Sequence, residues 1–201
     1  LPCAALTAWS AVAGGGPGGG GVRPGDKVLV QGTGGVALFA LAFARMFGAE
    51  VTVISSSDAK LAEAKALGAD HGVNYVETED WARATREITA ARGGYDLIVE
   101  LGGEKTLPLS LKAVRAGGTL ALIGVLSGLK LDASLGAVVT RQVRLQGVTV
   151  GHRQGFEAMT AAMAQHGTRP VIGKRFGFSE LHGAFEHLRS GGGMGKTVLE
   201  F

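Results

Sequence analysis

Cysteine is nearly absent from this chain, whose 201 residues include one, Cys3. A single cysteine excludes an internal disulfide and is typical of a reducing compartment, so we expect a cytoplasmic protein. Blocks of charge are also missing. The net charge is +3, and the basic residues are scattered, with Arg141 and Arg144 as the nearest approach to a cluster. Because no aromatic residues are interleaved with them, the composition argues against a nucleic-acid or membrane surface.

Long apolar runs are lacking too. Arg45 or glycines interrupt the longest ones, so we expect no segment that spans a bilayer. Leu1 opens the chain without a charged leader, so we expect no secretory signal. The length suits one large domain, or one and a half small ones, with a buried core.

Glycine, in contrast, is abundant, and its most informative cluster follows a short β-branched run at 27–31. Gly32, Gly34 and Ala37 have the G-x-G-x-x-A spacing of a dinucleotide site, and a long apolar helical pattern follows them. Gly32 permits a sharp turn, Gly34 lets a pyrophosphate approach the backbone, and Ala37 sets how closely helix and strand pack. Glycines also close ordinary βα turns, but a strand before and a helix after them favour nucleotide binding.

Strands alternate with helical patterns along the rest of the chain. Right-handed crossovers then predict an α/β, Rossmann-type, doubly wound parallel sheet of six strands with helices on both faces. We expect strands at 27–31, 50–54, 71–75, 95–100, 119–123 and 143–150, and helices at 58–67, 79–91, 104–116, 154–166 and 179–189, with a less regular segment at 132–142.

Four regions follow from this pattern. They are a lead-in helix (1–13), a glycine-rich loop or linker (14–21), a nucleotide-binding domain (22–174) and a C-terminal strand-helix-strand (175–201) that ends in a strand at 197–201.

The end of the second predicted strand indicates which nucleotide binds. An NAD site places an acid there, whereas this chain has Ser55, and its hydroxyl together with Lys60 suits the 2′-phosphate of NADP(H). Two alternatives stay open. Ser55–Ser57 could only cap the next helix, and Asp58 would become the ribose acid if the strand ended a few residues later.

An ordered set of segments resembles the coenzyme-binding part of the medium-chain dehydrogenase/reductase family, which includes zinc alcohol dehydrogenases and quinone oxidoreductases. The resemblance covers the whole chain and is carried by residues 1–9, 22–36, 66–75, 117–124 and 195–201.

The resemblance implies roles for individual residues. Thr7 would approach the nicotinamide carboxamide, and Lys196 would lie near the pyrophosphate, unless it is a solvated turn lysine. The remaining implied positions are the pyrophosphate loop (Gly32, Thr33, Gly34, Gly35, Val36, Ala37), the 2′-phosphate pocket (Ser55, Ser56, Lys60, Tyr75) and the segment beside the nicotinamide (Gly124, Val125, Leu126).

Metal binding is not expected. Cys3 matches a zinc ligand of zinc-dependent relatives, but the other ligands would come from a catalytic domain preceding residue 1, and we expect Cys3 to be a small buried residue of an apolar helix. The histidines lack metal-ligand spacing: His71, His152, His166, His182 and His187. Glu100 ends a strand at the ligand-binding edge, where we expect it to bond a neighbouring loop instead of acting in catalysis.

The sequence thus predicts the NADP(H)-binding part of an oxidoreductase that moves hydride between nicotinamide and a carbonyl or alcohol, a quinone or an enone. This chain alone would bind cofactor with little turnover. Relatives pair their sixth strand across a two-fold axis, so we expect a homodimer through Leu145–Val150. A non-catalytic module and an S-adenosylmethionine-dependent methyltransferase are the alternatives.

Overall fold

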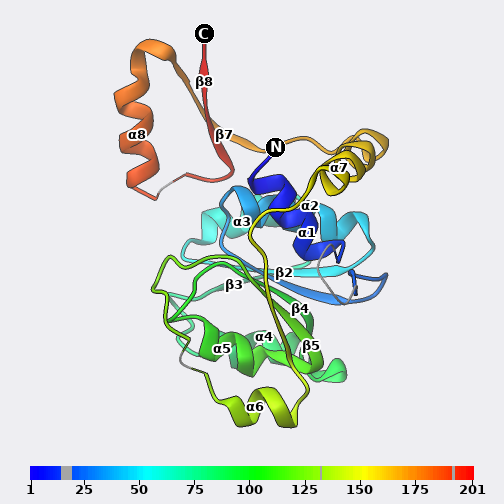
Figure 1. Ribbon diagram of the computed structural model, residues 1–201. Helices are drawn as coiled ribbons and strands as arrows, with labels where there is room; N and C mark the ends of the chain where they lie inside the picture. The colour runs from blue at the N-terminus through cyan, green and yellow to red at the C-terminus, as the bar shows by residue number, and fades with distance from the viewer. Residues whose placement is uncertain (15–19, 132, 192) are drawn as a thin grey trace.

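Six parallel strands form the centre of the computed structural model, which describes residues 1–14, 20–131, 133–191 and 193–201 (Figure 1). Their spatial order, β3-β2-β1-β4-β5-β6, runs outward in both directions from the β1/β4 pair. This order confirms the predicted Rossmann-type sheet, in which ligands bind outside the carboxyl ends of the strands. The strands are β1 (Lys27–Gln31), β2 (Glu50–Ser55), β3 (His71–Asn74), β4 (Tyr95–Glu100), β5 (Val114–Leu122) and β6 (Arg144–Gly147).

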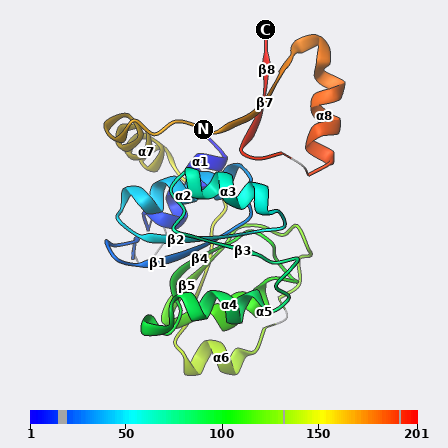
Figure 2. The ribbon, with the colours of Figure 1, turned by 180° about the vertical axis from the view of Figure 1, so that it is seen from behind.

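Helices cover both faces of the sheet, as the front and back views show (Figures 1 and 2). One face packs against α1 (Ala4–Val12), α2 (Gly35–Met46), α3 (Asp58–Ala66) and α7 (Arg153–His166). The other packs against α4 (Trp81–Ile88), α5 (Leu107–Ala113) and α6 (Leu135–Thr140). Among the described residues, none of these helices has the length and apolarity needed to cross a bilayer.

Alternation along the strands divides the core into two layers. Val28 and Val30 of β1 face the α2 side, whereas Leu29 between them faces the α4 and α5 side. Since successive side chains of a strand point to opposite faces, a strand buried on both faces must be apolar throughout. The continuous run at 27–31 therefore predicts a central strand, and β1 is one.

Predicted boundaries hold best where local signals are strong. Ser57 caps α3, because its side chain accepts a hydrogen bond from the Lys60 N–H at 3.5 Å, and Gly68 follows the helix end with φ +104°. The helix predicted at 104–116 is too long, because Val114 already pairs with Tyr95 in the sheet. The strand predicted at 143–150 is reduced to β6.

The C-terminal region forms a separate small unit. β7 (Ile172–Gly177) and β8 (Lys196–Glu200) pair in parallel, with a 3₁₀ turn at Phe178–Glu180 and α8 (Leu181–Arg189) between them. Both views show this unit projecting from the main body (Figures 1 and 2). It exposes apolar side chains, which include Phe178, Leu181, Phe185, Leu188 and Phe201. Of the predicted glycine-rich loop at 14–21, residues 15–19 lie outside the described residues.

Candidate dinucleotide site

The turn between β1 and α2 leaves its backbone open at the carboxyl edge of the sheet. Gly32 has φ +78° and donates its N–H to the Ile54 carbonyl at 2.7 Å, so it makes the sharp turn. Gly34 is the N-cap of α2 with ordinary extended angles, φ −75° and ψ −178°. A Cβ atom on Gly34 would have no neighbour within 4 Å in the part of the chain that the structure describes, so the space in front of it is open. Ala37, which is 1% exposed, packs inside.

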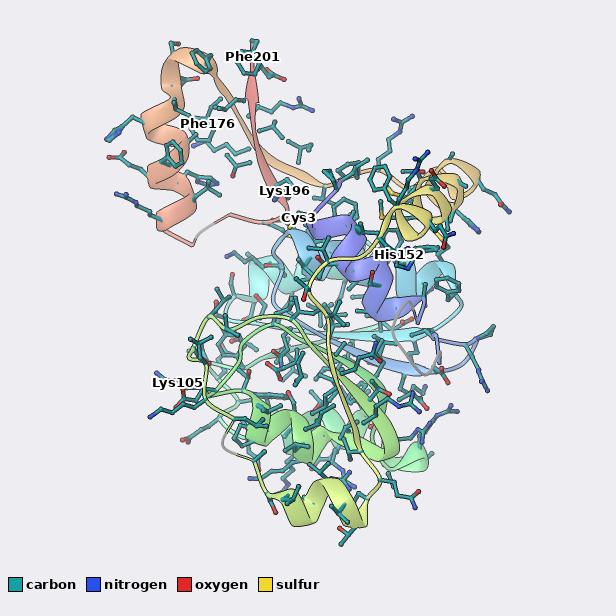
Figure 3. The ribbon with its side chains drawn as sticks, viewed as in Figure 1. Cys3, Lys105, His152, Phe176, Lys196 and Phe201 are labelled. Carbon is teal, nitrogen blue, oxygen red and sulfur yellow. The ribbon has the colours of Figure 1, made fainter. Side chains whose placement is uncertain are left out.

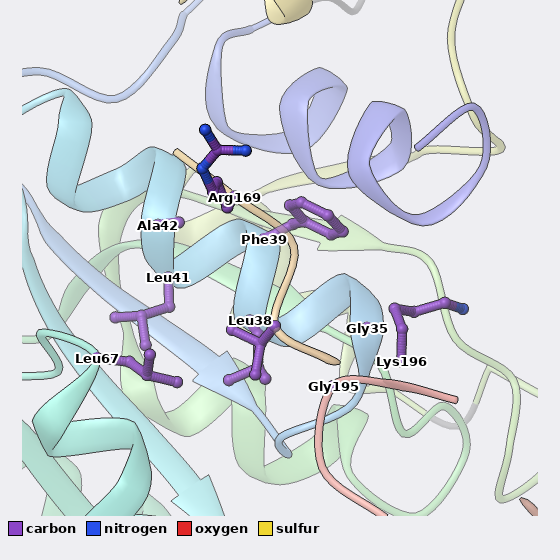
Figure 4. A pocket seen from close by; sticks show the side chains of 10 residues that line it. Gly35, Leu38, Phe39, Leu41, Ala42, Leu67, Arg169, Gly195 and Lys196 are labelled. Atoms are coloured by element: carbon purple, nitrogen blue, oxygen red, sulfur yellow. The ribbon is translucent and has the colours of Figure 1, made fainter. Parts of the chain in front are cut away.

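The start of α2 favours a negatively charged ligand. The first N–H groups of a helix lack partners within that helix, and here no side chain caps them and no acidic residue stands in the first turn. Lys196 lies directly beside this end: a Cβ on Gly35 would be 2.6 Å from its Cδ and 3.5 Å from its Nζ. Figure 4 shows the two residues side by side. Backbone donors and an ammonium group together suit a diphosphate.

Lys196 is held there by a backbone connection. The Gly195 N–H donates to the Thr33 carbonyl at 3.0 Å, and Gly34 and Gly195 form a parallel bridge. The adjoining hollow, drawn in Figure 4, has a volume of about 80 Å³ and is lined mainly by apolar side chains of α2. It has room for a few water molecules but not for a dinucleotide, so the candidate site is the open turn in front of Gly34.

The end of β2 supplies the second predicted region. Ser55 is the last residue of β2, is 3% exposed, and accepts the Tyr75 N–H on its carbonyl at 3.0 Å. Ser56 is exposed, and Tyr75 is 43% exposed. Ser57 alone caps α3, so the hydroxyls of Ser55 and Ser56 are not needed for capping.

Two charged groups near this strand end have partners within the protein. The Lys60 ammonium donates to the Gly191 carbonyl at 3.2 Å, which links α3 to the C-terminal unit. Asp58 is the first residue of α3, not a residue of the strand, and its carboxyl accepts a hydrogen bond from the Asn74 amide at 2.9 Å. β2 therefore ends at Ser55, and the Asp58 carboxyl is turned toward β3.

Glu100 organises the loop after β4, as expected, although most of its hydrogen-bond partners could not be predicted from local sequence. The side chain is 1% exposed. One oxygen accepts the N–H groups of Gly102 at 3.0 Å and Gly103 at 3.1 Å together with the Thr106 hydroxyl. The other accepts the Gln31 amide at 2.7 Å and the Ser110 hydroxyl. A carboxyl with five donors on it is a structural group and not a free acid.

Gln31 also holds the loop after β4. Its amide oxygen accepts the N–H groups of Leu101 at 3.0 Å and Gly102 at 3.1 Å, so β1 and β4 hold one loop between them. The one signal for this role is a glutamine that ends an otherwise apolar strand.

The segment after β5 packs against the same loop. The Gly124 N–H donates to the Glu100 carbonyl at 3.1 Å, and a Cβ on Gly124 would overlap the Leu101 carbonyl, so only glycine fits. Val125 and Leu126 are 57% and 90% exposed. They stand at the carboxyl edge with both side chains available to a ligand or another protein surface.

The first turn of α1 differs from the prediction at one residue. Cys3 is exposed and precedes the helix, because α1 begins at Ala4, so the expectation of a buried cysteine is wrong. Its carbonyl accepts the Thr7 hydroxyl at 2.8 Å, and Thr7 is 3% exposed. In the ranges that the structure describes, no three His, Cys, Asp or Glu side chains are grouped as metal ligands would be. Cys3 is labelled at the start of α1 in Figure 3.

Comparison with known proteins gives the following matches. Residues 35–165 match the family model described as Zinc-binding dehydrogenase. The zinc-type alcohol dehydrogenase-like protein C1773.06c of Schizosaccharomyces pombe is 41% identical over 204 residues, which cover 100% of this chain and 58% of that protein. The chain also matches the crystal structure of a candidate alcohol dehydrogenase from Sinorhizobium meliloti 1021, with a TM-score of 0.91 and 46% sequence identity. That match covers 100% of this chain and 57% of the other chain.

The descriptions of two further similar solved structures name a coenzyme. An NAD-dependent alcohol dehydrogenase is 32% identical with a TM-score of 0.87, and 57% of its chain is covered. The crotonyl-CoA carboxylase/reductase AntE in complex with NADP is 26% identical with a TM-score of 0.89, and 54% of its chain is covered. The present chain thus spans a little more than half the length of the proteins it matches.

Proposed function

The chain belongs to the zinc-binding dehydrogenase family, and from that membership we propose that it is the NADP(H)-binding part of a two-domain oxidoreductase. The reaction would transfer hydride between the nicotinamide and a carbonyl or alcohol, a quinone or an activated alkene. A single observation carries the proposal: the uncapped start of α2, with open space in front of Gly34 and Lys196 beside it. The dehydrogenase relatives do not favour the methyltransferase alternative or a purely structural module.

The residues of this chain would bind and orient the coenzyme. Backbone N–H groups of the turn at 32–37, with Lys196, would hold the diphosphate. Thr7 and the segment 124–126 would border the nicotinamide, which when bound supplies or accepts the hydride. We assign no catalytic residue to this chain, because Glu100 is occupied by the loop after β4.

Ser55, Ser56, Lys60 and Tyr75 would form the 2′-phosphate pocket. Hydroxyl and ammonium groups donate to a phosphate, whereas a carboxylate at the end of β2 would repel it. Both NAD-dependent and NADP-bound proteins occur among the structural matches, so the preference rests on Ser55 at the end of β2.

The Ser55→Asp variant tests this preference. We expect its Kd for NADPH to rise by about 30-fold to 100-fold and its Kd for NADH to change by less than about 3-fold, because the new charge opposes only the extra phosphate. Calorimetric titration with each coenzyme measures both constants. Wild-type protein that prefers NADH would contradict the assignment.

Lys60→Ala supports the same test without adding a buried charge. It should weaken NADPH binding by about 10-fold, whereas Lys65→Ala, at an exposed position on the same helix, should leave it unchanged. Equal losses in both variants would point to a general effect of charge.

A homodimer and a cytoplasmic location are further parts of the proposal. Among the described residues β6 is the edge strand of the sheet and pairs with β5 alone. A second copy would pair with it and with the residues that follow, over Leu145–Val150. Light scattering at micromolar concentration should give twice the mass of one chain, and a monomeric mass would contradict it. The exposed thiol of Cys3 suits a reducing compartment.

A further inference from the structure

A polar cavity, separate from the apolar hollow beside α2, lies at the amino edge of the sheet, opposite the Gly34 turn. It has a volume of about 450 Å³, which is within the range of small-molecule sites. It extends across the starts of β1, β4, β5 and β6, and the charged residues that line it are Arg23, Asp26, Arg92, Asp96, Arg115 and Arg144. Nothing in the proposed coenzyme site uses these residues, since parallel strands place their two ends at opposite edges.

An irregularity in β5 directs one of these arginines inward. The pairing with β4 shifts between Tyr95 and Leu97, where the partner residue changes from Val114 to Thr119, so several β5 residues loop out. Gly117 takes φ +70° in this bulge, and a Cβ on Gly118 would approach the Tyr95 carbonyl at 2.8 Å. Bulges commonly redirect a side chain beside a site, and this one places Arg115 against Asp96.

Asp96 fixes two guanidinium groups at the cavity wall. Its side chain is 6% exposed and accepts hydrogen bonds from Arg92 Nε at 2.8 Å and from Arg115 Nε at 2.6 Å. The Lys27 N–H donates to it as well, at 2.8 Å. Burial alone would raise the pKa of this carboxyl, but these donors outweigh burial and lower it. Both arginines are thereby pre-positioned, which reduces the entropy lost when a ligand binds.

Arg23 and Arg144 add positive charge that the cavity does not neutralise. Among the described residues, neither guanidinium has a hydrogen-bond or ion-pair partner. Arg144 reaches toward the segment before β1, because its Nη1 would be 3.3 Å from a Cβ on Gly20. The second carboxylate, Asp26, already accepts from Arg92 Nη2 at 2.9 Å and from the Arg23 N–H at 2.8 Å. Four arginines against two aspartates leave an excess of two positive charges.

We propose that this amino-edge cavity binds a phosphate group, either as inorganic phosphate or as the end of a small phosphate monoester. A phosphate monoester carries a charge of about −1.5 to −2 at pH 7 and accepts several hydrogen bonds, which matches the charge excess and the guanidinium donors. Arg92 and Arg115, held by Asp96, form the fixed wall, and Arg23 and Arg144, which also line the cavity, would supply the further guanidinium donors.

Equilibrium dialysis of the full chain with inorganic phosphate, and separately with phenyl phosphate, tests the proposal at constant ionic strength. Each titration is repeated with saturating NADPH, because the coenzyme turn also attracts phosphate. We expect one phosphate site per chain to remain in the presence of NADPH. In the Arg23→Ala/Arg144→Ala double variant its Kd should rise by about 10-fold or more. Tighter binding of phenyl phosphate would indicate a monoester, and tighter binding of inorganic phosphate would indicate the free anion.

The matched control is the Arg153→Ala/Arg189→Ala double variant, which removes the same charge from exposed positions elsewhere. It should bind phosphate as the wild type does. Loss of all phosphate binding on addition of NADPH, or equal weakening in both double variants, would overturn the proposal. Failure of NADPH itself to bind would instead contradict the coenzyme assignment, and the comparison of the two double variants would still decide the amino-edge site.

Discussion

Replacing Gly34 by serine should abolish measurable NADPH binding, with a rise in Kd of about 100-fold or more, while the melting temperature stays within about 3 °C of the wild type. The expected loss arises because the added Cβ and hydroxyl would occupy the open space where the diphosphate approaches the backbone. The fold should tolerate the change, since Gly34 has extended angles that any residue adopts, and serine is a favoured N-cap. Titration calorimetry and thermal unfolding measure the two quantities.

Gly136→Ser is the matched control for that experiment. Gly136 lies in α6 on the far side of the sheet from α2, and among the residues described there a Cβ would meet the Ser134 hydroxyl alone, at 3.7 Å. This variant should bind NADPH with wild-type affinity. If Gly34→Ser bound NADPH as well as the control does, the turn would not be the diphosphate site.

Removal of the Glu100 side chain should give the largest loss of stability. Glu100→Ala would remove one acceptor that five buried or part-buried donors share, among them the Gln31 amide and two backbone N–H groups. Each unsatisfied buried group costs about 1–3 kcal/mol, and partial relaxation limits the sum, so we expect the free energy of unfolding to fall by about 3–5 kcal/mol. Urea unfolding followed by circular dichroism measures this difference.

The control is Glu87→Ala, since the Glu87 side chain is 70% exposed and, within the described ranges, pairs with Arg83 alone. We expect a change below about 0.5 kcal/mol for it. A loss under 1 kcal/mol in Glu100→Ala would mean that the loop after β4 reorganises around water, and Glu100 would then be available for another role.

Local sequence predicted those parts of the fold that depend on local signals. β1 and β4 begin and end at the predicted residues, because each is a short, mostly apolar run with a glycine within two positions of both ends. The predicted helix at 104–116 overshot its end for the opposite reason. Pairing of Val114 with Tyr95 depends on a strand contact that residues 104–116 do not encode by themselves.

The candidate site also has one part that local sequence predicts and one part that it does not. The glycine turn and Ser55 follow from spacing within one βαβ unit, β1-α2-β2. The contact of Lys196 with Gly35, and that of Lys60 with Gly191, join residues more than 130 positions apart and require the folded chain. The amino-edge cavity could not be predicted, because its arginines are scattered in sequence and have no pattern that distinguishes them from solvated surface charges. The fold brings them together, and the β5 bulge places Arg115 against Asp96.

The bridge between Gly34 and Gly195 has a practical consequence for the smallest fragment that can bind coenzyme. A chain shortened to the residues before 174 would keep every strand of the six-stranded sheet, yet it would lose the ammonium group beside Gly35 and the backbone partner of Thr33. The proposed coenzyme site is therefore discontinuous in sequence. Deletion mapping that follows secondary structure alone would cut through that proposed site while preserving the sheet around it.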